Sequence, residues 1–277
     1  MARRYSLDPA LPVLLRPDGT VQVGWDPRRA VRVRPPLGLS TAALADLLRM
    51  LQTGAGTDDL ARETGIGDDD VDDLISALIG AGVAHPSRSR QAARAPALRV
   101  HGRGPLADLL VDALRCSGAR IRHSHHPHAV VRPEGTDLVV LTDFLVVEPR
   151  LLRDLHDARV PHLQVRVRDG VGVVGPLVLP GLTSCLACAD LHRSDRDAHW
   201  PAVAAQLRDT VGAAGRATVL ATAALALSQI DTVLTAIRDG DEARLPAPAT
   251  LSTTLEFDAA THTIATRHWP RHPLCGC

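Results

Sequence analysis

The sequence predicts an α/β protein in which a Rossmann-type sheet follows a small winged-helix-like domain. Three observations lead to this prediction. Short apolar runs after residue 97 alternate with amphipathic helical patterns, which is typical of a parallel sheet covered by helices. A GxGxxA turn at residues 102–107 separates an expected strand from an expected helix. Before residue 86, three strand patterns precede three helical patterns.

The first domain is expected to cover residues 1–86. Two strand patterns flank the turn Arg16-Pro17-Asp18-Gly19, and a third alternates apolar residues with arginine. These strands are residues 12–15, 21–25 and 30–33. Ser40 or Thr41 caps the first expected helix and Thr57 the second. The three helices cover residues 41–51, 58–64 and 69–79, and residues 83–85 begin a wing strand.

The polar, arginine-rich residues 87–96 indicate a linker, and residues 97–277 form the larger domain. Its expected strands are residues 97–101, 119–122, 137–141, 161–166 and 170–179, with a closing hairpin at 251–258 and 261–267. Its expected helices are residues 106–116, 149–158 and 202–238, the last interrupted near residues 212–215.

The charge balance excludes several function classes. The 31 basic residues equal the 31 acidic ones, so the whole chain offers no argument for binding nucleic acid or an anionic membrane. No apolar run approaches the roughly 18 residues that span a bilayer, and the basic N-terminus makes a poor signal peptide. We therefore expect a cytoplasmic protein. Every basic residue is arginine, which excludes Schiff-base and P-loop lysines.

A winged helix suggests DNA binding, but the expected recognition helix begins with aspartates at 68–70 and 72–73, which phosphates would repel. Peptide recognition is the favoured alternative, and a purely structural cap is the third. An extended peptide could add to an exposed edge at residues 30–33 and lie in a groove beside the third helix. The expected peptide-binding residues are Val31, Arg32, Val33, Arg34 and Leu74. Proline at Val31 or Val33 should then abolish binding and mostly spare the fold.

The turn Gly102-Arg103-Gly104-Pro105 could hold a phosphate at a helix N-terminus. A nucleotide site also needs an acidic residue at the end of the second strand, and that end has none. Asp143, after the third strand, is the one carboxylate placed to meet a metal–phosphate group. Gly102, Gly104 and Asp143 therefore indicate a degenerate nucleotide site.

Four of the five cysteines form two close pairs, Cys185 with Cys188 and Cys275 with Cys277. Zinc prefers four thiolates in a tetrahedron, and a CxxC and a CxC segment supply them. A site filled by four sulfurs has no open position, so the expected zinc is structural. Redox-active or unligated thiols are the alternative. Cys116 is expected to be a buried helix residue.

Three segments carry a family resemblance. GPLVLPGLTSCLAC at 175–188, DLHRSDRDAHWP at 190–201 and the terminal HPLCGC at 272–277 resemble the E1-like, ThiF-related proteins of thiazole/oxazole-modified microcin biosynthesis. The order of three strands and three helices before residue 86 is similar to the peptide-recognition domain that such proteins carry. The resemblance is strong after residue 97 and looser before it.

The resemblance implies a scaffold. Proteins of this group bind the leader of a precursor peptide and present its core to a YcaO-type partner, which uses ATP to cyclodehydrate Cys, Ser or Thr. It also implies a homodimer paired through residues 217–237, and it carries the zinc ligands over as the four paired cysteines. Active E1 and ThiF enzymes adenylate a carboxylate, but only Gly102, Gly104 and Asp143 carry over from their nucleotide site. An active adenylyltransferase for a small protein or peptide C-terminus is the alternative.

Overall fold

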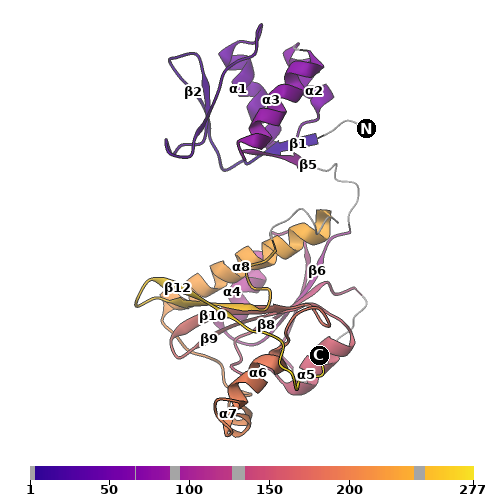
Figure 1. The fold of residues 1–277 in the computed structure, drawn as a ribbon, viewed down its shortest axis with the longest axis vertical. Helices are drawn as coiled ribbons and strands as arrows, with labels where there is room; N and C mark the ends of the chain where they lie inside the picture. Colours follow the sequence, from indigo (N-terminus) through magenta and orange to yellow (C-terminus); the bar gives the residue numbers. More distant parts are fainter. Residues whose placement is uncertain (1–3, 66, 88–93, 127–134, 240–246) are drawn as a thin grey trace. The chain divides into compact units, whose positions relative to one another are not determined.

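The computed structural model describes residues 4–65, 67–87, 94–126, 135–239 and 247–277. The chain divides into two compact units, Met1–Ala92 and Ala93–Cys277 (Figure 1). Most of the expected linker at 87–96 lies outside the described residues, and the strand before it continues to Ser87.

The first unit contains two small sheets and three helices. One sheet orders its strands β2 (Val13–Leu15), β3 (Val21–Val23) and β4 (Val31–Val33), all antiparallel. The other pairs β1 (Arg4–Leu7) with β5 (Ala84–Ser87). The sequence patterns did not predict β1, which is the partner of the expected wing strand. The winged-helix classification itself stays a prediction.

The helices of the first unit are α1 (Thr41–Gln52), α2 (Thr57–Thr64) and α3 (Asp68–Gly80). Ser40 caps α1 by accepting the N–H of Ala43, as the sequence predicts. The expected cap of α2 is wrong, because Gly56 is the N-cap and no side chain caps this helix. The helices and both sheets share one core, whose largest fully buried side chains are Leu7, Leu44, Leu47, Leu48, Leu51, Leu60, Ile75 and Leu78.

The second unit is built on a seven-stranded mixed sheet in the order β12-β11-β10-β9-β8-β6-β7. Its parallel strands are β6 (Ala97–His101), β7 (Arg120–Ser124), β8 (Leu138–Thr142) and β9 (His162–Arg168). Its antiparallel extension is β10 (Val171–Val178), β11 (Thr253–Asp258) and β12 (Thr263–His268). The strand order reverses between β6 and β8, which is where ligands bind in open α/β sheets.

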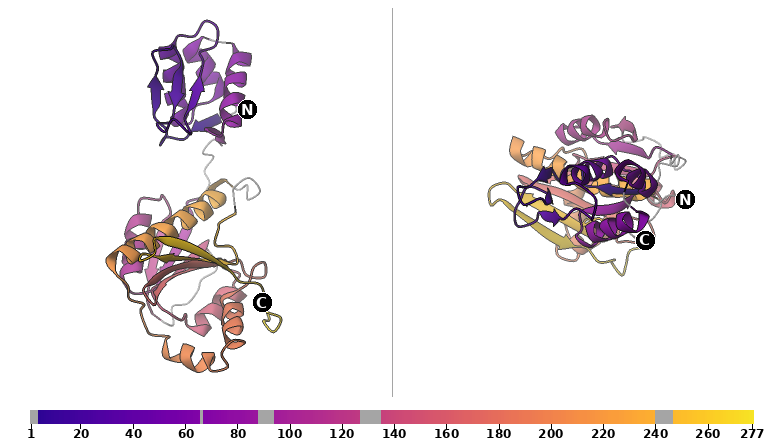
Figure 2. Two further views of the ribbon diagram at one scale, coloured as in Figure 1. Left: turned by 60° about the vertical axis from the view of Figure 1, so that its left-hand side comes forward. Right: turned by 90° about the horizontal axis from the view of Figure 1, so that it is seen from above.

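Helices cover the two faces of this sheet (Figures 1 and 2). On one face lie α4 (Pro105–Leu114) and α8 (Arg216–Asp239), and on the other lie α5 (Pro149–Asp157) and α6 (Leu186–Ser194). A short helix, α7 (Trp200–Gln206), follows α6. The long helical region expected at 202–238 is therefore two helices, separated around the predicted interruption. The sequence patterns did not predict α6.

Helix α8 is long and apolar enough to cross a membrane by length and composition. In the structure it covers the sheet, where Ala226, Ile230 and Leu234 are buried. Its outer face exposes Leu220, half of whose surface is accessible, among small side chains. The expected pairing of two copies through this helix stays a prediction.

The close approach of α8 to the sheet depends on Gly172 in β10. A Cβ built on Gly172 would lie 1.9 Å from the Oγ1 atom of Thr222. The Gly172→Ala change should therefore lower the free energy of unfolding of the second unit by about 2 kcal/mol, because an overpacked core forces its neighbours to shift. Urea unfolding followed by tryptophan fluorescence measures this.

Gly215→Ala is the matched control, because nothing lies within 4 Å of the added Cβ. Combining Gly172→Ala with Thr222→Ala should restore part of the lost stability. A Gly172→Ala protein as stable as the wild type would contradict this packing.

Candidate functional site

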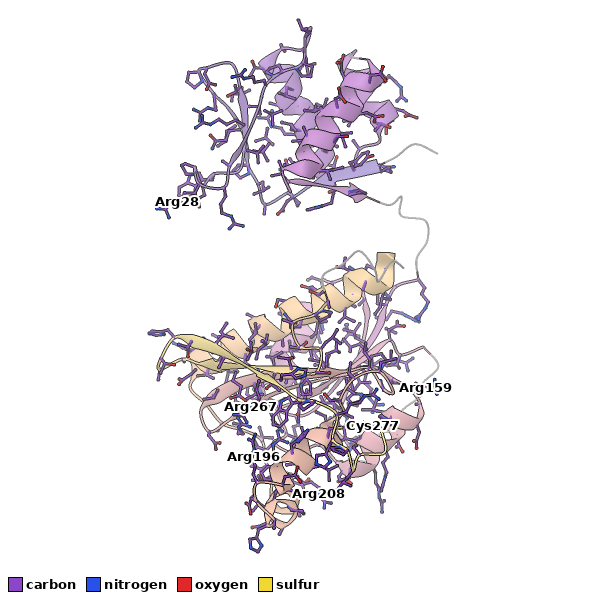
Figure 3. All side chains as sticks on the ribbon, in the orientation of Figure 1. Arg28, Arg159, Arg196, Arg208, Arg267 and Cys277 are labelled. Atoms are coloured by element: carbon purple, nitrogen blue, oxygen red, sulfur yellow. The ribbon has the colours of Figure 1, made fainter. Side chains whose placement is uncertain are left out.

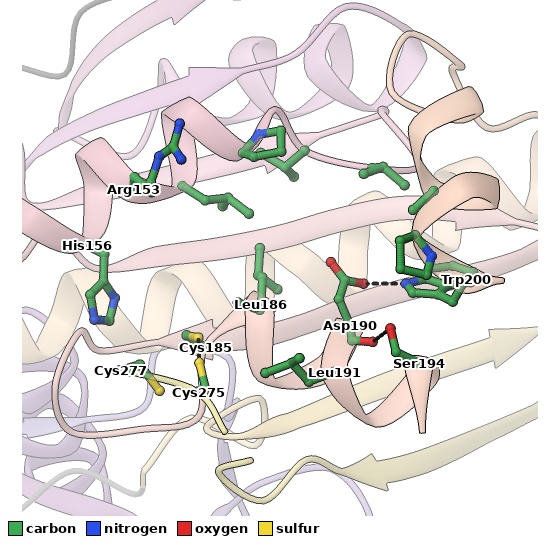
Figure 4. Close-up of a pocket in the computed structure, with 18 of the residues that line it drawn as sticks. Arg153, His156, Cys185, Leu186, Asp190, Leu191, Ser194, Trp200, Cys275 and Cys277 are labelled. Atoms are coloured by element: carbon green, nitrogen blue, oxygen red, sulfur yellow. Dashed lines mark hydrogen bonds between the residues drawn. The ribbon is translucent and has the colours of Figure 1, made fainter. Parts of the chain in front are cut away.

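The two cysteine pairs lie together although about 90 residues separate them. Cys185 is the N-cap of α6 and Cys188 lies in its first turn, so residues three apart face the same side. Cys275 and Cys277 belong to the segment that follows β12 and returns to this helix (Figure 4). The second unit therefore brings all four predicted zinc ligands to one place.

The sulfur positions match a tetrahedral zinc site. The Sγ atoms of Cys185 and Cys188 are 3.8 Å apart, those of Cys185 and Cys275 3.5 Å, and those of Cys188 and Cys277 3.4 Å. All four sulfurs lie within 4.8 Å of one another. Zn–S bonds of about 2.3 Å in a tetrahedron place the sulfurs about 3.8 Å apart. The cluster could therefore hold one metal ion, and its size is compatible with zinc.

The electrostatics of the cluster favour a cation. Burial raises the pKa of the Cys185 thiol and raises that of Cys277 to about 11. Burial acts in the same direction on Cys188, but hydrogen bonds from the backbone of His272 and Cys185 lower its pKa to about 7. Four thiolates this close repel one another, so a divalent cation is what would stabilise them together.

A histidine supports the segment that carries Cys275. The Nε2 atom of His272 lies 2.9 Å from Oδ2 of Asp195, at the end of α6, and its Nδ1 atom accepts the N–H of Leu274. His192 packs edge-on against the His272 ring. These three side chains also cluster closely enough to hold a metal ion. However, an acceptor at Nδ1 places the ring proton on Nε2, so that nitrogen donates to Asp195 and has no lone pair for a metal.

The glycine-rich turn packs against the end of β8. A Cβ on Gly102 would lie 2.0 Å from Oγ1 of Thr142, and one on Gly104 would lie 2.7 Å from Oδ1 of Asp143. Both glycines are therefore required for the turn to approach the next strand. This requirement holds whether or not the turn binds a phosphate.

Asp143 occupies the N-terminus of α4 with its own carboxylate. Its Oδ1 accepts the N–H of Leu106 at 3.0 Å, and its Oδ2 accepts the N–H of Ala107 at 2.9 Å. The residue is 1% exposed. Burial raises the pKa of Asp143, while these two backbone hydrogen bonds act in the opposite direction. The donors that would bind a phosphate at this helix terminus thus have an internal acceptor.

The ends of β6 and β7, beside this turn, carry basic and neutral groups. The Nε2 atom of His123 lies 3.0 Å from the carbonyl oxygen of Gly102, and Arg99 donates to the hydroxyl of Ser124. Burial, followed by the charge of Arg99, lowers the pKa of His101 to about 4, so this ring is neutral at pH 7. Among the described residues at the ends of β6 and β7, none is acidic, so this edge has no carboxylate to bind the hydroxyls of a ribose.

The register of the first unit identifies the free edge of β4. Gly24 donates to Pro12 and Arg16 donates to Thr20, so residues 20, 22 and 24 bond to β2. Val21 and Val23 therefore bond to β4, opposite Val33 and Val31. The N–H and C=O of Arg32 point away from β3, and among the described residues β4 pairs with β3 alone.

This register corrects the expectation about proline. Val31 and Val33 direct their N–H groups at β3, so proline at either position removes a hydrogen bond from the sheet itself. Arg32 is the residue whose N–H lies at the free edge. Leu74, also expected to contact a peptide, is 6% exposed and shares a buried cluster with Val33, so it packs beneath the surface. Arg32 and Arg34 are exposed.

A large cavity beside the cysteine cluster was not predicted from the sequence. It measures about 530 Å³ and lies among α5, α6, α7 and the C-terminal segment (Figure 4). Its floor adjoins β9, where His162, Gln164 and Arg166 are polar yet buried. The alternation of polar and apolar residues in HLQVRVR was the available signal. By itself, this alternating pattern indicates only a strand.

Cys116 also differs from expectation. It lies beyond the end of α4 and is exposed.

Comparison with solved structures identifies proteins of similar fold. The heterocyclase TruD superposes with a TM-score of 0.68 at 14% identity, over 99% of this chain and 42% of TruD. A heterocyclase in complex with substrate and cofactor gives 0.69 at 14% identity, over 100% of this chain and 39% of its own. E. coli MccB with MccA-N7isoASN gives 0.59 at 14% identity, over 99% of both chains.

This chain thus spans about two fifths of the two heterocyclase chains and has a fold similar to theirs and to that of MccB. No family model matches the sequence, and no curated protein matches it.

The predicted zinc site leads to an expectation that can be tested directly. The purified chain should contain about one zinc ion, and deletion of residues 275–277 should release it and lower the melting temperature, because two of the four sulfurs are lost. Elemental analysis and thermal unfolding measure both effects. Cys116→Ser, an exposed thiol outside the cluster, is the matched control. Full zinc occupancy in the truncated chain would exclude this ligand set.

The Asp143 cap makes a second prediction. Asp143→Ala should lower the free energy of unfolding of the second unit by about 2 kcal/mol, because two buried N–H groups lose their acceptor. Asp143→Asn retains one carbonyl oxygen as an acceptor, so its free energy of unfolding should fall by less. Denaturant unfolding monitored through Trp200 and Trp269 provides the measurement. An alanine variant of wild-type stability would show that the carboxylate is not the structural cap.

Proposed function

We propose that this protein is a zinc-containing scaffold that binds a precursor peptide and presents it to a peptide-modifying enzyme of the YcaO type. The scaffold itself does not adenylate its peptide. The single observation that carries the proposal is the free edge of β4 in the first unit, whose backbone groups can pair with an extended peptide.

The neighbouring structures support a peptide as the ligand. MccB has been solved with MccA and with N-formylated MccA, and a heterocyclase has been solved with its substrate and cofactor. Peptide binding by proteins of this fold makes the same ligand class the natural candidate here. The YcaO-type partner rests on the segments around the cysteines that resemble microcin-biosynthesis proteins.

Charges around the edge favour a peptide over DNA. Arg32 and Arg34 are exposed along and after β4, while α3 exposes Asp69, Asp70 and two further aspartates. A peptide with both acidic and basic residues can pair with both surfaces, whereas phosphates would meet the acidic helix.

The capped nucleotide turn supports a scaffold without adenylation. MccB has been solved with ATP, so the fold alone does not exclude a nucleotide. In this chain, however, Asp143 already accepts the N–H groups at the start of α4, and the sequence contains no lysine to contact phosphates. ATP–pyrophosphate exchange by the pure protein would favour the adenylyltransferase instead.

Substitutions at Arg32 test the peptide edge. Arg32→Pro removes the outward N–H and should weaken binding of the peptide about tenfold or more, because each added strand depends on such backbone hydrogen bonds. Arg32→Ala keeps the N–H and serves as the matched control, for which we expect a smaller loss of peptide affinity. The probes are synthetic peptides that cover the small open reading frames beside the gene, and fluorescence anisotropy with the full chain gives their affinity.

Val31→Pro distinguishes the edge from the fold. It breaks pairing with β3, so it should destabilise the first unit, whereas Arg32→Pro should leave the circular dichroism spectrum and the melting temperature nearly unchanged. If a peptide binds the wild type and Arg32→Pro equally, strand addition at β4 is wrong.

A further inference from the structure

A buried arginine lies under α6 and α7 without a full set of partners. Arg166, on β9, is 7% exposed and donates from NH1 to the carbonyl oxygen of Leu145. Its Nε atom is buried and has no hydrogen-bond partner among the described residues. Burial, with the charges of Arg193 and Arg168, lowers the pKa of Arg166 to about 9, so the group is still charged at pH 7. A buried, unpaired donor on a charged group is costly unless a ligand or water completes it.

The surroundings of Arg166 are basic. Arg193 lies between the rings of Trp200 and Trp269, with Cζ 5.3 Å and 4.9 Å from their centroids. Its NH1 atom bonds to Asp190 at 2.7 Å. Contact with both rings restricts the orientation of the Arg193 guanidinium, so its N–H groups are preorganised hydrogen-bond donors.

Positive charge exceeds negative charge in this cluster. Arg168 and Arg267 share Glu256, at 3.4 Å and 3.7 Å. Arg267 is labelled in Figure 3. Arg166, Arg168 and Arg193 thus face two partly buried carboxylates, Asp190 and Glu256, so positive charge is in excess around Arg166. Asp169, the other carboxylate near Arg168, is 91% exposed and screened by water.

A small hollow lies between this charge and the large cavity. Arg166, Arg193 and Gln164 line a space of about 20 Å³, enough for a water molecule or one oxygen of an anion. The hollow and the 530 Å³ cavity share six lining residues, namely Val146, Val147, Leu152, Leu186, Asp190 and Trp200. The cationic end and the large cavity are therefore neighbouring spaces that share one wall.

The large cavity has the size and lining of a small-molecule site. Apolar side chains of α5, α6 and α7 form most of its wall, including Leu152, Leu186, Leu191 and Pro201 (Figure 4). Pockets of 300–1,000 Å³ with few polar groups are typical of sites for small organic ligands. The cavity has room for an apolar body, and the Nε atom of Arg166, which lacks a partner among the described residues, supplies the polar group that would orient it.

We propose that this cavity binds a small apolar carboxylate, with its hydrocarbon body between α5, α6 and α7 and its carboxylate on Arg166 and Arg193. The site lies in the second unit and uses no residue of the β4 edge. It is therefore independent of the peptide-binding proposal, and failure of one does not affect the other. Cys185, Cys275 and Cys277 also line the cavity, but the proposed carboxylate partners, Arg166 and Arg193, are not among the cysteine cluster.

The test compares three probes on the full-length, zinc-loaded protein. Octanoate should bind at least tenfold more tightly than acetate, which lacks the apolar body, and than octanamide, which lacks the charge. Isothermal titration calorimetry gives the affinities, and the melting temperature should rise with octanoate in a saturable manner. Equal affinity for acetate would indicate a small-anion site only, and equal affinity for octanamide an apolar site only. Either result, or no octanoate binding, overturns the proposal.

Variants locate the two ends of the ligand. Arg166→Met should weaken octanoate binding at least tenfold, and Ala204→Trp, which adds bulk to the cavity wall from α7, should do the same. Arg153→Gln is the matched control, because Arg153 is an exposed arginine on the cavity wall away from the hollow. Zinc content and circular dichroism verify the fold of each variant. Octanoate binding that survives both Arg166→Met and Ala204→Trp, or that is lost only in Arg153→Gln, contradicts the assignment.

Discussion

The close approach of four cysteine sulfurs is the contact that links the distant segments of the second unit. Cys185 and Cys188 begin α6, while Cys275 and Cys277 end the segment that follows the β11–β12 hairpin. Their sulfurs approach within 4.8 Å of one another, a spacing at which one metal ion could be held by all four. The cluster thereby joins a helix on one face of the sheet to the end of the chain. The hydrogen bond between His272 and Asp195 joins the same two segments a second time.

That connection also forms the wall of the large cavity. Cys185, Cys275 and Cys277 line it together with α5, α6 and α7. The floor belongs to β9, whose inward side chains on this face are His162, Gln164 and Arg166, while Leu163, Val165 and Val167 pack on the opposite face. A central strand with two buried faces is usually apolar throughout. Polar residues on one of its faces place charge inside the unit, which is where a ligand can use it.

At the glycine turn, the requirement for glycine comes from packing against the end of β8. Gly102 and Gly104 are required because Thr142 and Asp143 lie where their side chains would be. Asp143 then satisfies the first N–H groups of α4 with its own carboxylate. The strand order still reverses at this point, as in nucleotide-binding sheets, but the anion there is part of the chain. Function in this protein consequently depends on its surfaces and cavities more than on its fold class.

The sequence by itself predicted the order of most elements and singled out the four cysteines that the structure brings together. Hydrophobic periodicity and capping residues specify helices and strands locally, and cysteine pairs of this spacing have few chemical uses. The tertiary structure decided what depends on distant partners. The β1 strand exists because β5 pairs with it 80 residues later, and α6 begins where the cysteine cluster forms. The outward N–H of Arg32 follows from the register between β2 and β3, and the unpaired Nε of Arg166 follows from what packs above β9. Pattern along a chain specifies which face a residue occupies, whereas hydrogen-bond partners and cavities arise only when separate segments meet.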